Sequence, residues 1–192
     1  MNAERRAIAA ELLASGRAHD KAETDRLERF RNVETETAEL LAVLVRSCGA
    51  RRILELGTSN GYSTIWLADA AEAVGGAVTS IEIDPARTAL AQATLARAGL
   101  GADLVTGDAG EVLRSSAEGA WDMVFLDAER PAYAGYWPDL KRVLRPGGGL
   151  LAIDNVLSHA AEVAAVTALI EAEAAVATVL VPIGAGLRLV VV

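Results

Sequence analysis

The chain has 192 residues, of which 52% are hydrophobic, and it carries a net charge of −8 with an isoelectric point near 4.8. The length predicts one domain with a sizeable core, and the acidity argues against broad contact with nucleic-acid phosphates. No apolar run approaches the length of a membrane span, so we expect no membrane partner. No leader-like segment opens the chain, and the single Cys48 cannot form an internal disulfide. We therefore expect a cytoplasmic protein.

The first third of the chain has helical periodicity. Residues 4–14 are rich in alanine, and Ser15 with Gly16 is expected to end this first helix. A polar stretch follows, in which we expect His19 to be solvated. A second helix is predicted over residues 34–47, closed by Gly49. We interpret residues 1–50 as a helical cap and residues 51–192 as the core of the same single domain.

The arginines of this region stand among acidic residues. Such mixed charge is typical of a solvated helix or loop face, and we interpret most of these arginines in that way. They are Arg26, Arg29, Arg31, Arg51 and Arg52.

Strand-like and helix-like segments alternate from residue 52 onward. Strands are predicted at 52–56, 77–83, 102–106, 121–127, 148–154, 177–181 and 187–192, with helices beginning near Gly61, Pro85, Ala109, Ala132 and Ser158. This alternation predicts an α/β fold with a mostly parallel sheet and helices on both faces. The short turn at 182–186 predicts that the last two strands form an antiparallel hairpin at one edge.

A glycine-rich loop follows the first strand. Gly57 and Gly61 are separated by three residues, so Ser59 occupies the position of the second glycine in a dinucleotide fingerprint. This spacing disfavours a pyrophosphate ligand and a nicotinamide-dependent oxidoreductase. S-adenosylmethionine, which presents an amino acid instead, becomes the candidate, and Glu82 at the end of the next strand is expected to hold its ribose. The alternative is an ordinary turn with a glycine hinge.

Three oxygen-bearing side chains follow two later strands. Asp127 ends one apolar run, and Asp154 and Asn155 end the next. The carboxyl ends of parallel strands share one edge, so these side chains are expected to meet there. Hard oxygen ligands favour Mg²⁺, with Ca²⁺ or Mn²⁺ as alternatives. A single aspartate at a strand end is also a common helix cap.

These features together resemble the cation-dependent small-molecule O-methyltransferases, the group that contains the catechol and caffeoyl-CoA enzymes. The resemblance covers residues 31–192. It rests on ILELGTSNGYST (53–64), IEIDP (81–85), AGL (98–100), GDA (107–109), WDMVFLDAERPAYAGYW (121–137), LRPGGGLLAIDN (144–155) and VPIGAGLRL (181–189). It implies a Rossmann-like, seven-stranded methyltransferase sheet with a reversed last strand, S-adenosylmethionine as methyl donor, a divalent cation, and a homodimer.

The resemblance also assigns roles to particular residues. Glu55 and Gly57 are expected at the methionine end of the methyl donor, Ser63 at its carboxylate, Glu82 at the ribose and Ala109 beside the adenine. Asp127 is expected to contact the donor's amine and the cation, with Asp154 and Asn155 as further cation ligands. The segment at Asn32 and Val33 is expected to approach the site of methyl transfer.

One position departs from the family pattern. The family has a lysine three residues after the first metal-binding aspartate, where it can act as a base, and this chain has Arg130. An arginine keeps its proton, so Arg130 is expected to hold an anionic substrate or to stabilise a metal-bound oxyanion, with deprotonation left to the metal and solvent. The alternative is an exposed arginine paired with a neighbouring acid. His159 is the second candidate for catalysis, because its ordinary pKa suits proton transfer near neutrality; the alternative is a surface histidine.

The expected substrate is a small hydroxylated molecule, preferably a catechol or another vicinal diol, whose two oxygens can chelate a cation. Two alternatives stay open. One is methylation of a hydroxylated tRNA uridine, which the acidic composition disfavours. The other is a cofactor-binding protein whose catalysis is altered or lost.

Overall fold

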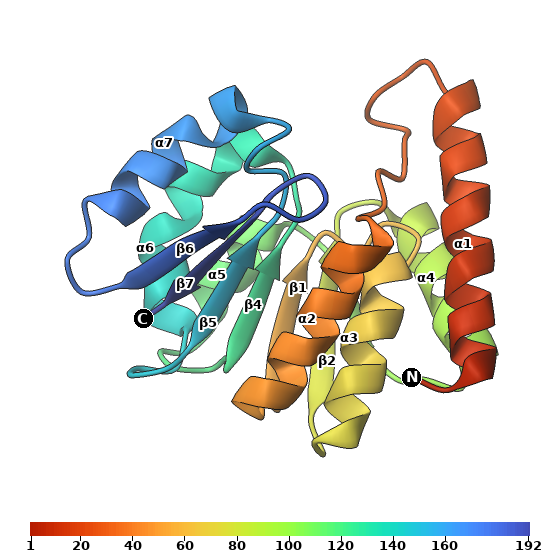
Figure 1. Ribbon diagram of the computed structural model, residues 1–192, viewed down its shortest axis with the longest axis horizontal. Helices are drawn as coiled ribbons and strands as arrows, with labels where there is room; N and C mark the ends of the chain where they lie inside the picture. The colour runs from red at the N-terminus through yellow and green to blue at the C-terminus, as the bar shows by residue number, and fades with distance from the viewer.

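The computed structural model describes residues 1–192 as a seven-stranded sheet with helices packed on both faces (Figure 1). The strands are β1 (Arg52–Leu56), β2 (Ala77–Glu82), β3 (Asp103–Thr106), β4 (Met123–Leu126), β5 (Leu150–Ile153), β6 (Ala177–Val181) and β7 (Leu187–Val191). Their order is β3-β2-β1-β4-β5-β7-β6. The first five strands are parallel, and β7 runs antiparallel to both β5 and β6. The predicted α/β fold and its antiparallel edge hairpin are confirmed.

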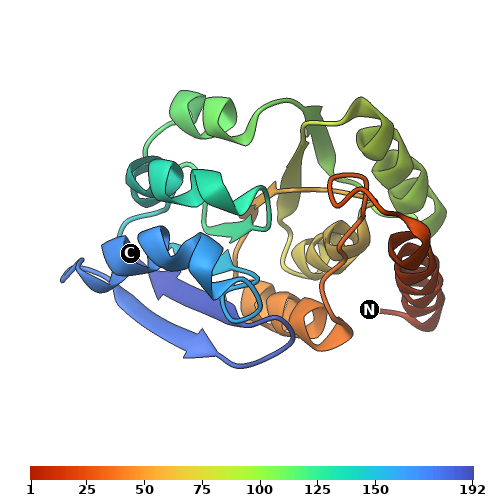
Figure 2. The same cartoon turned by 90° about the horizontal axis from the view of Figure 1, so that it is seen from above.

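The helices form two layers, one on each face of the sheet (Figure 2). They are α1 (Ala3–Ala22), α2 (Thr35–Cys48), α3 (Tyr62–Ala73), α4 (Pro85–Ala98), α5 (Ala109–Ser115), α6 (Tyr133–Val143) and α7 (Ala160–Glu171). Helices α1 to α4 contribute buried residues to the core on one face, and α5 to α7 to the core on the other. The N-terminal helices are therefore part of one layer of the fold.

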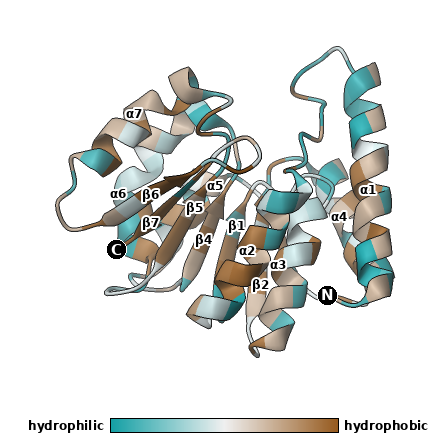
Figure 3. Ribbon diagram, viewed as in Figure 1, coloured by the Kyte–Doolittle hydropathy of each residue, from teal (hydrophilic) through white to brown (hydrophobic).

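Alternation along the central strands explains these two cores. In β1, Ile53 belongs to the cluster beneath α2 and α3, whereas Leu54 belongs to the cluster beneath α6 and α7. Met123 and Val124 divide in the same way on β4. Successive side chains of a strand point to opposite faces, so a strand covered on both sides is mostly apolar, and the buried Glu55 is the exception in β1. The brown central strands in Figure 3 follow that pattern.

The first helix is longer than the sequence predicts. Ser15 and Gly16 do not end it, and α1 continues to Ala22. A glycine in a helix costs about 1 kcal/mol relative to alanine, which packing can offset. Gly16 is buried, and a Cβ atom there would lie 2.9 Å from the Asn32 side chain. The glycine therefore allows the segment after the helix to pack closely against it. Gly49 ends α2 as predicted, with φ of 59°.

Several strands are shorter than predicted at their carboxyl ends. The predicted strands included Asp127 and Asp154, whereas β4 ends at Leu126 and β5 at Ile153. Both aspartates instead begin the loops at the carboxyl edge of the sheet. None of the helices combines the length and the apolar character that crossing a membrane requires.

Candidate functional site

A cavity of about 420 Å³ lies at the carboxyl edge of the parallel strands. The loops after β1, β2, β3, β4 and β5 all contribute to its wall, together with the segment between α1 and α2. This is the edge at which open α/β sheets bind ligands. Its wall includes Gly57, Ser63, Glu82, Ala109, Asp127 and Asn155, six of the residues expected from the sequence.

The glycine-rich loop is held close to the end of β4. Gly57 has a φ of 105°, and a Cβ atom at this position would lie 2.2 Å from the carbonyl oxygen of Asp127. Only glycine combines that conformation with that approach. Gly61 has a φ of 87° and caps the N-terminus of α3, so the first turn of this helix faces the loop. The unpaired amide groups of such a helix end favour an anionic or polar ligand.

Glu55 lies behind the cavity wall. It is fully buried, and its carboxylate accepts hydrogen bonds from Ser63 (2.6 Å), Thr64 (2.6 Å) and Ser80 (2.5 Å). Burial raises the pKa of Glu55 to about 7, although the three hydroxyl groups counteract this effect. Ser63 lines the cavity, so Glu55 acts on the wall through the hydroxyl group that it orients.

Glu82 stands at the end of β2 and lines the cavity. Its two carboxylate oxygens accept the backbone amides of Ser59 (2.8 Å) and Asp84 (3.1 Å). These bonds fix the carboxylate between the glycine-rich loop and the start of α4, where a ligand's hydroxyl groups can donate to it. Ala109, the first residue of α5, lies on the same wall.

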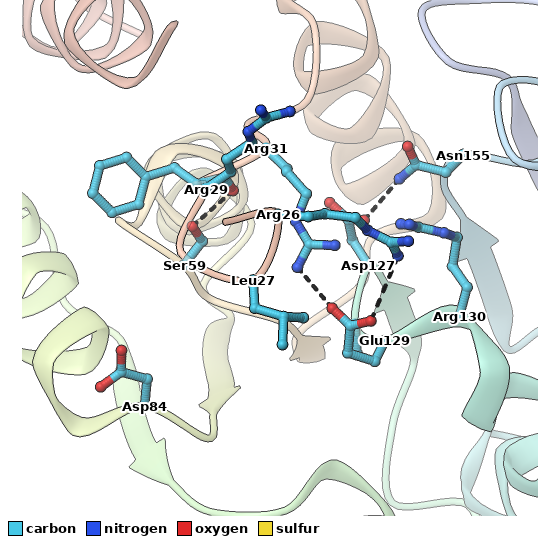
Figure 4. Close-up of polar contacts among 12 residues, drawn as sticks. Arg26, Leu27, Arg29, Arg31, Ser59, Asp84, Asp127, Glu129, Arg130 and Asn155 are labelled. Carbon is cyan, nitrogen blue, oxygen red and sulfur yellow. Dashed lines mark hydrogen bonds and ion pairs between the residues drawn. The ribbon is translucent and has the colours of Figure 1, made fainter. Parts of the chain in front are cut away.

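Asp127, Asp154 and Asn155 meet as the sequence predicts. The side-chain amide of Asn155 donates to Asp127 (2.9 Å) and to Asp154 (3.0 Å), as Figure 4 shows for the Asp127 contact. Burial raises the pKa of both carboxyl groups, and the charge of Asp127 raises the pKa of Asp154 further. Asp154 is 2% exposed, and its Oδ1 atom is buried without a hydrogen-bond partner.

This cluster is chemically suited to a divalent cation. A buried carboxylate with an unsatisfied oxygen and a half-buried carboxylate that repels it are stabilised when a cation lies between them. A half-turn of the Asn155 amide would present its oxygen in place of its nitrogen, since the two ends have the same shape. The structure has no group of three or more His, Cys, Asp or Glu side chains arranged for a metal. Any cation here would therefore use the amide oxygen and exogenous oxygen atoms besides the two aspartates.

Arg130 is not the exposed arginine that one of the two interpretations expected. Its side chain is 3% exposed, and its Nε donates to Glu162 of α7 at 2.9 Å. The terminal Nη2 atom is buried without a partner. Arg130 lines the cavity beside Asp127 and Asn155, so it is part of the site.

His159 lies at the N-terminus of α7, outside the cavity wall. Its Nδ1 is 2.8 Å from the Ser158 hydroxyl, which in turn is 3.4 Å from the side-chain oxygen of Asn155. Burial, and then the charge of Arg130, lowers the pKa of His159. The imidazole is therefore connected to the Asn155 side chain only through Ser158.

A strap, defined here as residues 23–34 between α1 and α2, crosses the cavity, and most of its role is not apparent from the sequence. Arg87 of α4 donates to the carbonyl oxygens of Leu27 and Arg29, and Ser59 donates to that of Phe30 (2.9 Å). Asn32 and Val33 of the strap line the cavity, as expected. Arg31 is not one of the arginines of a solvated face, because it lines the cavity and pairs with Glu129 at 2.7 Å.

His19 belongs to the last turn of α1 and not to a separate polar turn. It is exposed, yet its ring stacks against Phe30 of the strap at 4.3 Å between centroids. Its Nε2 atom lies 3.1 Å from the carbonyl oxygen of Glu28. His19 thus helps to hold the strap.

Backbone strain marks the same cavity. Three non-glycine residues have positive φ: Arg31 (51°), Ser59 (51°) and Asn155 (66°). All three line the cavity, and they come from the strap, the glycine-rich loop and the loop after β5. Such conformations persist where the surrounding structure holds them, and they concentrate at functional sites.

Comparison with known proteins identifies the family. Residues 9–191 match the sequence profile of a family described as O-methyltransferase. The chain is 40% identical over 131 residues to a catechol O-methyltransferase of Niastella koreensis, covering 66% of this chain and 58% of that protein. It is 37% identical over 153 residues to a catechol O-methyltransferase of Mycobacterium tuberculosis, covering 79% and 65%. The matched region thus spans less than two thirds of either relative.

A solved structure agrees with the sequence comparisons. The O-methyltransferase from Bacillus cereus in complex with SAH superposes with a TM-score of 0.81 at 27% identity, covering 97% of this chain and 90% of that chain. The expected family resemblance is confirmed. The chain belongs to the O-methyltransferase family.

Proposed function

We propose that the protein transfers a methyl group from S-adenosylmethionine to a hydroxyl group of a small molecule, with the help of a divalent cation. The preferred acceptor is a catechol or another vicinal diol. The observation that carries the proposal is the cluster of Asp127, Asp154 and Asn155, of which Asp127 and Asn155 line the same cavity as the glycine-rich loop and Glu82. One pocket can thus hold a methyl donor beside a cation-chelating acceptor.

The donor's two ends have matching partners in the cavity. Glu82 presents a fixed carboxylate to the ribose hydroxyl groups, and Ala109 lies on the adjoining wall. Ser63 and the first turn of α3 face the methionine carboxylate, near Gly57. S-adenosylmethionine supplies a methyl group that its sulfonium already activates. The protein's contribution is then to align the accepting oxygen with that methyl group and to exclude water.

Asp127, Asp154 and Asn155 are the residues that would hold the cation, Mg²⁺ being the first candidate and Ca²⁺ or Mn²⁺ the alternatives. A divalent cation at this point supplies Lewis acidity, which lowers the pKa of a neighbouring hydroxyl group. The strap also lines the cavity, and we propose that Asn32 and Val33 lie near the reacting groups. These residues exclude solvent from the reacting groups.

The fate of the acceptor's proton depends on His159 and Arg130. Arg130 keeps its own proton at any working pH, so it cannot accept one. The lowered pKa of His159 keeps its imidazole unprotonated near neutrality. The Ser158 hydroxyl lies between the imidazole and the side-chain oxygen of Asn155, and its single proton can be donated to either of them. We propose that Ser158 donates this proton to His159 while its oxygen takes the proton of the acceptor's hydroxyl group, so that His159 is the final proton acceptor.

The proposal is tested by methyl transfer from S-adenosylmethionine to a panel of catechols, monophenols and aliphatic diols, with Mg²⁺ or with EDTA. We expect turnover with catechols that EDTA abolishes. Turnover that EDTA leaves unchanged would exclude the cation, and methylation of undermodified tRNA but no small molecule would favour the tRNA alternative. His159→Ala and Ser158→Ala should both lose activity most strongly near neutrality and above, where the lowered pKa leaves the native imidazole unprotonated, and should approach the native rate at lower pH, where that imidazole is protonated.

A further inference from the structure

Arg130 has hydrogen-bonding capacity that the protein does not use. A guanidinium group has five N–H donors, and the hydrogen bond to Glu162 uses only Nε. Nη2 is buried without a partner, although the side chain is 3% exposed. Leaving a buried cationic donor unsatisfied is costly, and most buried donors are paired. The missing acceptor is therefore expected to come from a ligand in the cavity that Arg130 lines.

The guanidinium groups around Arg130 outnumber the glutamates that pair with them. Figure 4 shows that the side chains of Arg26, Arg31 and Arg130 gather beside Glu129, near Asp127. Arg31 pairs with Glu129 at 2.7 Å, and Arg26 lies 3.4 Å from Glu162 and 3.8 Å from Glu129. Three guanidinium groups thus share two glutamates. Asp127 and Asp154 lie on the adjoining side, where the proposed cation would balance them.

We propose that Arg130 binds a carboxylate on the methyl acceptor, so that the substrate is a hydroxylated acid, such as a catechol carboxylate. This inference rests on the proposed function. Arg130 lines the same wall as Asp127 and Asn155, so an acceptor whose oxygens lie against these residues has its remaining atoms near the guanidinium group. The fork of an arginine matches a carboxylate in shape, and a carboxylate oxygen would supply the acceptor that the buried Nη2 atom lacks.

The test compares acids with their uncharged esters. The probes are protocatechuate, homoprotocatechuate and dihydrocaffeate, three catechol acids with successively longer spacers, each beside its methyl ester. Binding to the protein with SAH is measured by calorimetry with and without Mg²⁺, and methylation rates are measured in parallel. We expect at least one acid to bind about tenfold to a hundredfold more tightly than its ester, the range for a charge-assisted hydrogen bond.

Variants locate this preference. Arg130→Gln should remove the preference for the acid, because it weakens binding of the acid and leaves binding of the ester unchanged. Arg97→Gln is the control and should keep the preference. Arg97 is 54% exposed and pairs with Glu11 away from the cavity. Glu162→Gln keeps Arg130 and removes a neutralising charge, so it should increase the preference for the acid. If Arg130→Gln fails to fold, Glu162→Gln still decides whether Arg130 binds the carboxylate.

Each outcome separates this inference from the proposed function. If every acid binds the native protein as tightly as its ester, Arg130 does not have the proposed role. If the enzyme nevertheless methylates the hydroxyl groups of the esters, the proposed function stands. A preference for the acid that persists in Arg130→Gln would place the carboxylate elsewhere and also overturn the inference. If no catechol is methylated, the proposed function fails. The ratio of the dissociation constants of acid and ester, measured by calorimetry, still decides whether Arg130 binds a carboxylate.

Discussion

Replacing the buried Glu55 by glutamine should change how the stability of the protein depends on pH. The folded state raises the pKa of Glu55 from its ordinary 4.5 to about 7, so it holds this proton more tightly than the unfolded chain does. Stability therefore falls as the pH rises from 4.5 to 7 and stays reduced above that. At about 1.4 kcal/mol per pH unit, the difference corresponds to a loss of about 3 kcal/mol. Glu55→Gln has no proton to lose, and the three surrounding hydroxyl groups can accept from or donate to its amide.

The assay is urea unfolding at several pH values between 5 and 8, without divalent cations. Between pH 5 and 8 we expect the free energy of unfolding of Glu55→Gln to rise by about 2.5 kcal/mol relative to that of the native protein, because part of the total change lies below pH 5. Asp127 and Asp154 are present in both proteins, so their own pH dependence largely cancels in the comparison. The exposed Glu118→Gln serves as the control and should show no such gain. Parallel stability curves for Glu55→Gln and the native protein would refute the reasoning.

Three further predictions concern the cavity wall. Gly57→Ala should lower the free energy of unfolding in urea by at least about 2 kcal/mol, because residue 57 has a φ of 105° and its Cβ atom would lie 2.2 Å from a backbone oxygen. The control Gly101→Ala should change the free energy of unfolding little, because there is open space around that residue. Glu82→Gln should weaken SAH binding about tenfold in calorimetry, as expected for the loss of one charged acceptor; unchanged affinity would remove Glu82 from the ribose site. Asp154→Asn should abolish the Mg²⁺ binding that calorimetry measures. It should not lower the stability of the metal-free protein, because the carboxylate oxygen that it replaces has no hydrogen-bond partner. A marked loss of stability would contradict that account.

Local sequence patterns account for most of the architecture. The apolar strand segments from β1 to β7 and the glycine after α2 have periodicities and end signals that act over a few residues. The meeting of Asp127 with Asp154 and Asn155 also followed from the sequence, because parallel neighbouring strands bring their carboxyl ends to one edge. The spacing of Gly57 and Gly61 likewise indicated the cavity.

Features that depend on distant contacts were not predictable in this way. Helix α1 passes Gly16 because Asn32 packs there, and the strap crosses the cavity because Arg87 and Ser59 bind its carbonyl groups. No periodicity within the strap itself encodes those partners. The short-range signals at Ser15 and Gly16 favoured a helix end, and tertiary packing overrode them.

The sequence by itself determined the succession of strands and helices along the chain, the two-sided sheet and the edge that carries the site, because these depend on hydrophobic periodicity and on the geometry of parallel strands. Only the tertiary structure decided which polar groups on that edge are satisfied. Arg130 is buried because Glu162, which lies 32 residues further along the chain, accepts one of its hydrogen bonds, and its Nη2 has no partner because no other acceptor reaches it. Burial and pairing are properties of the packed chain, so a residue's local sequence cannot specify them.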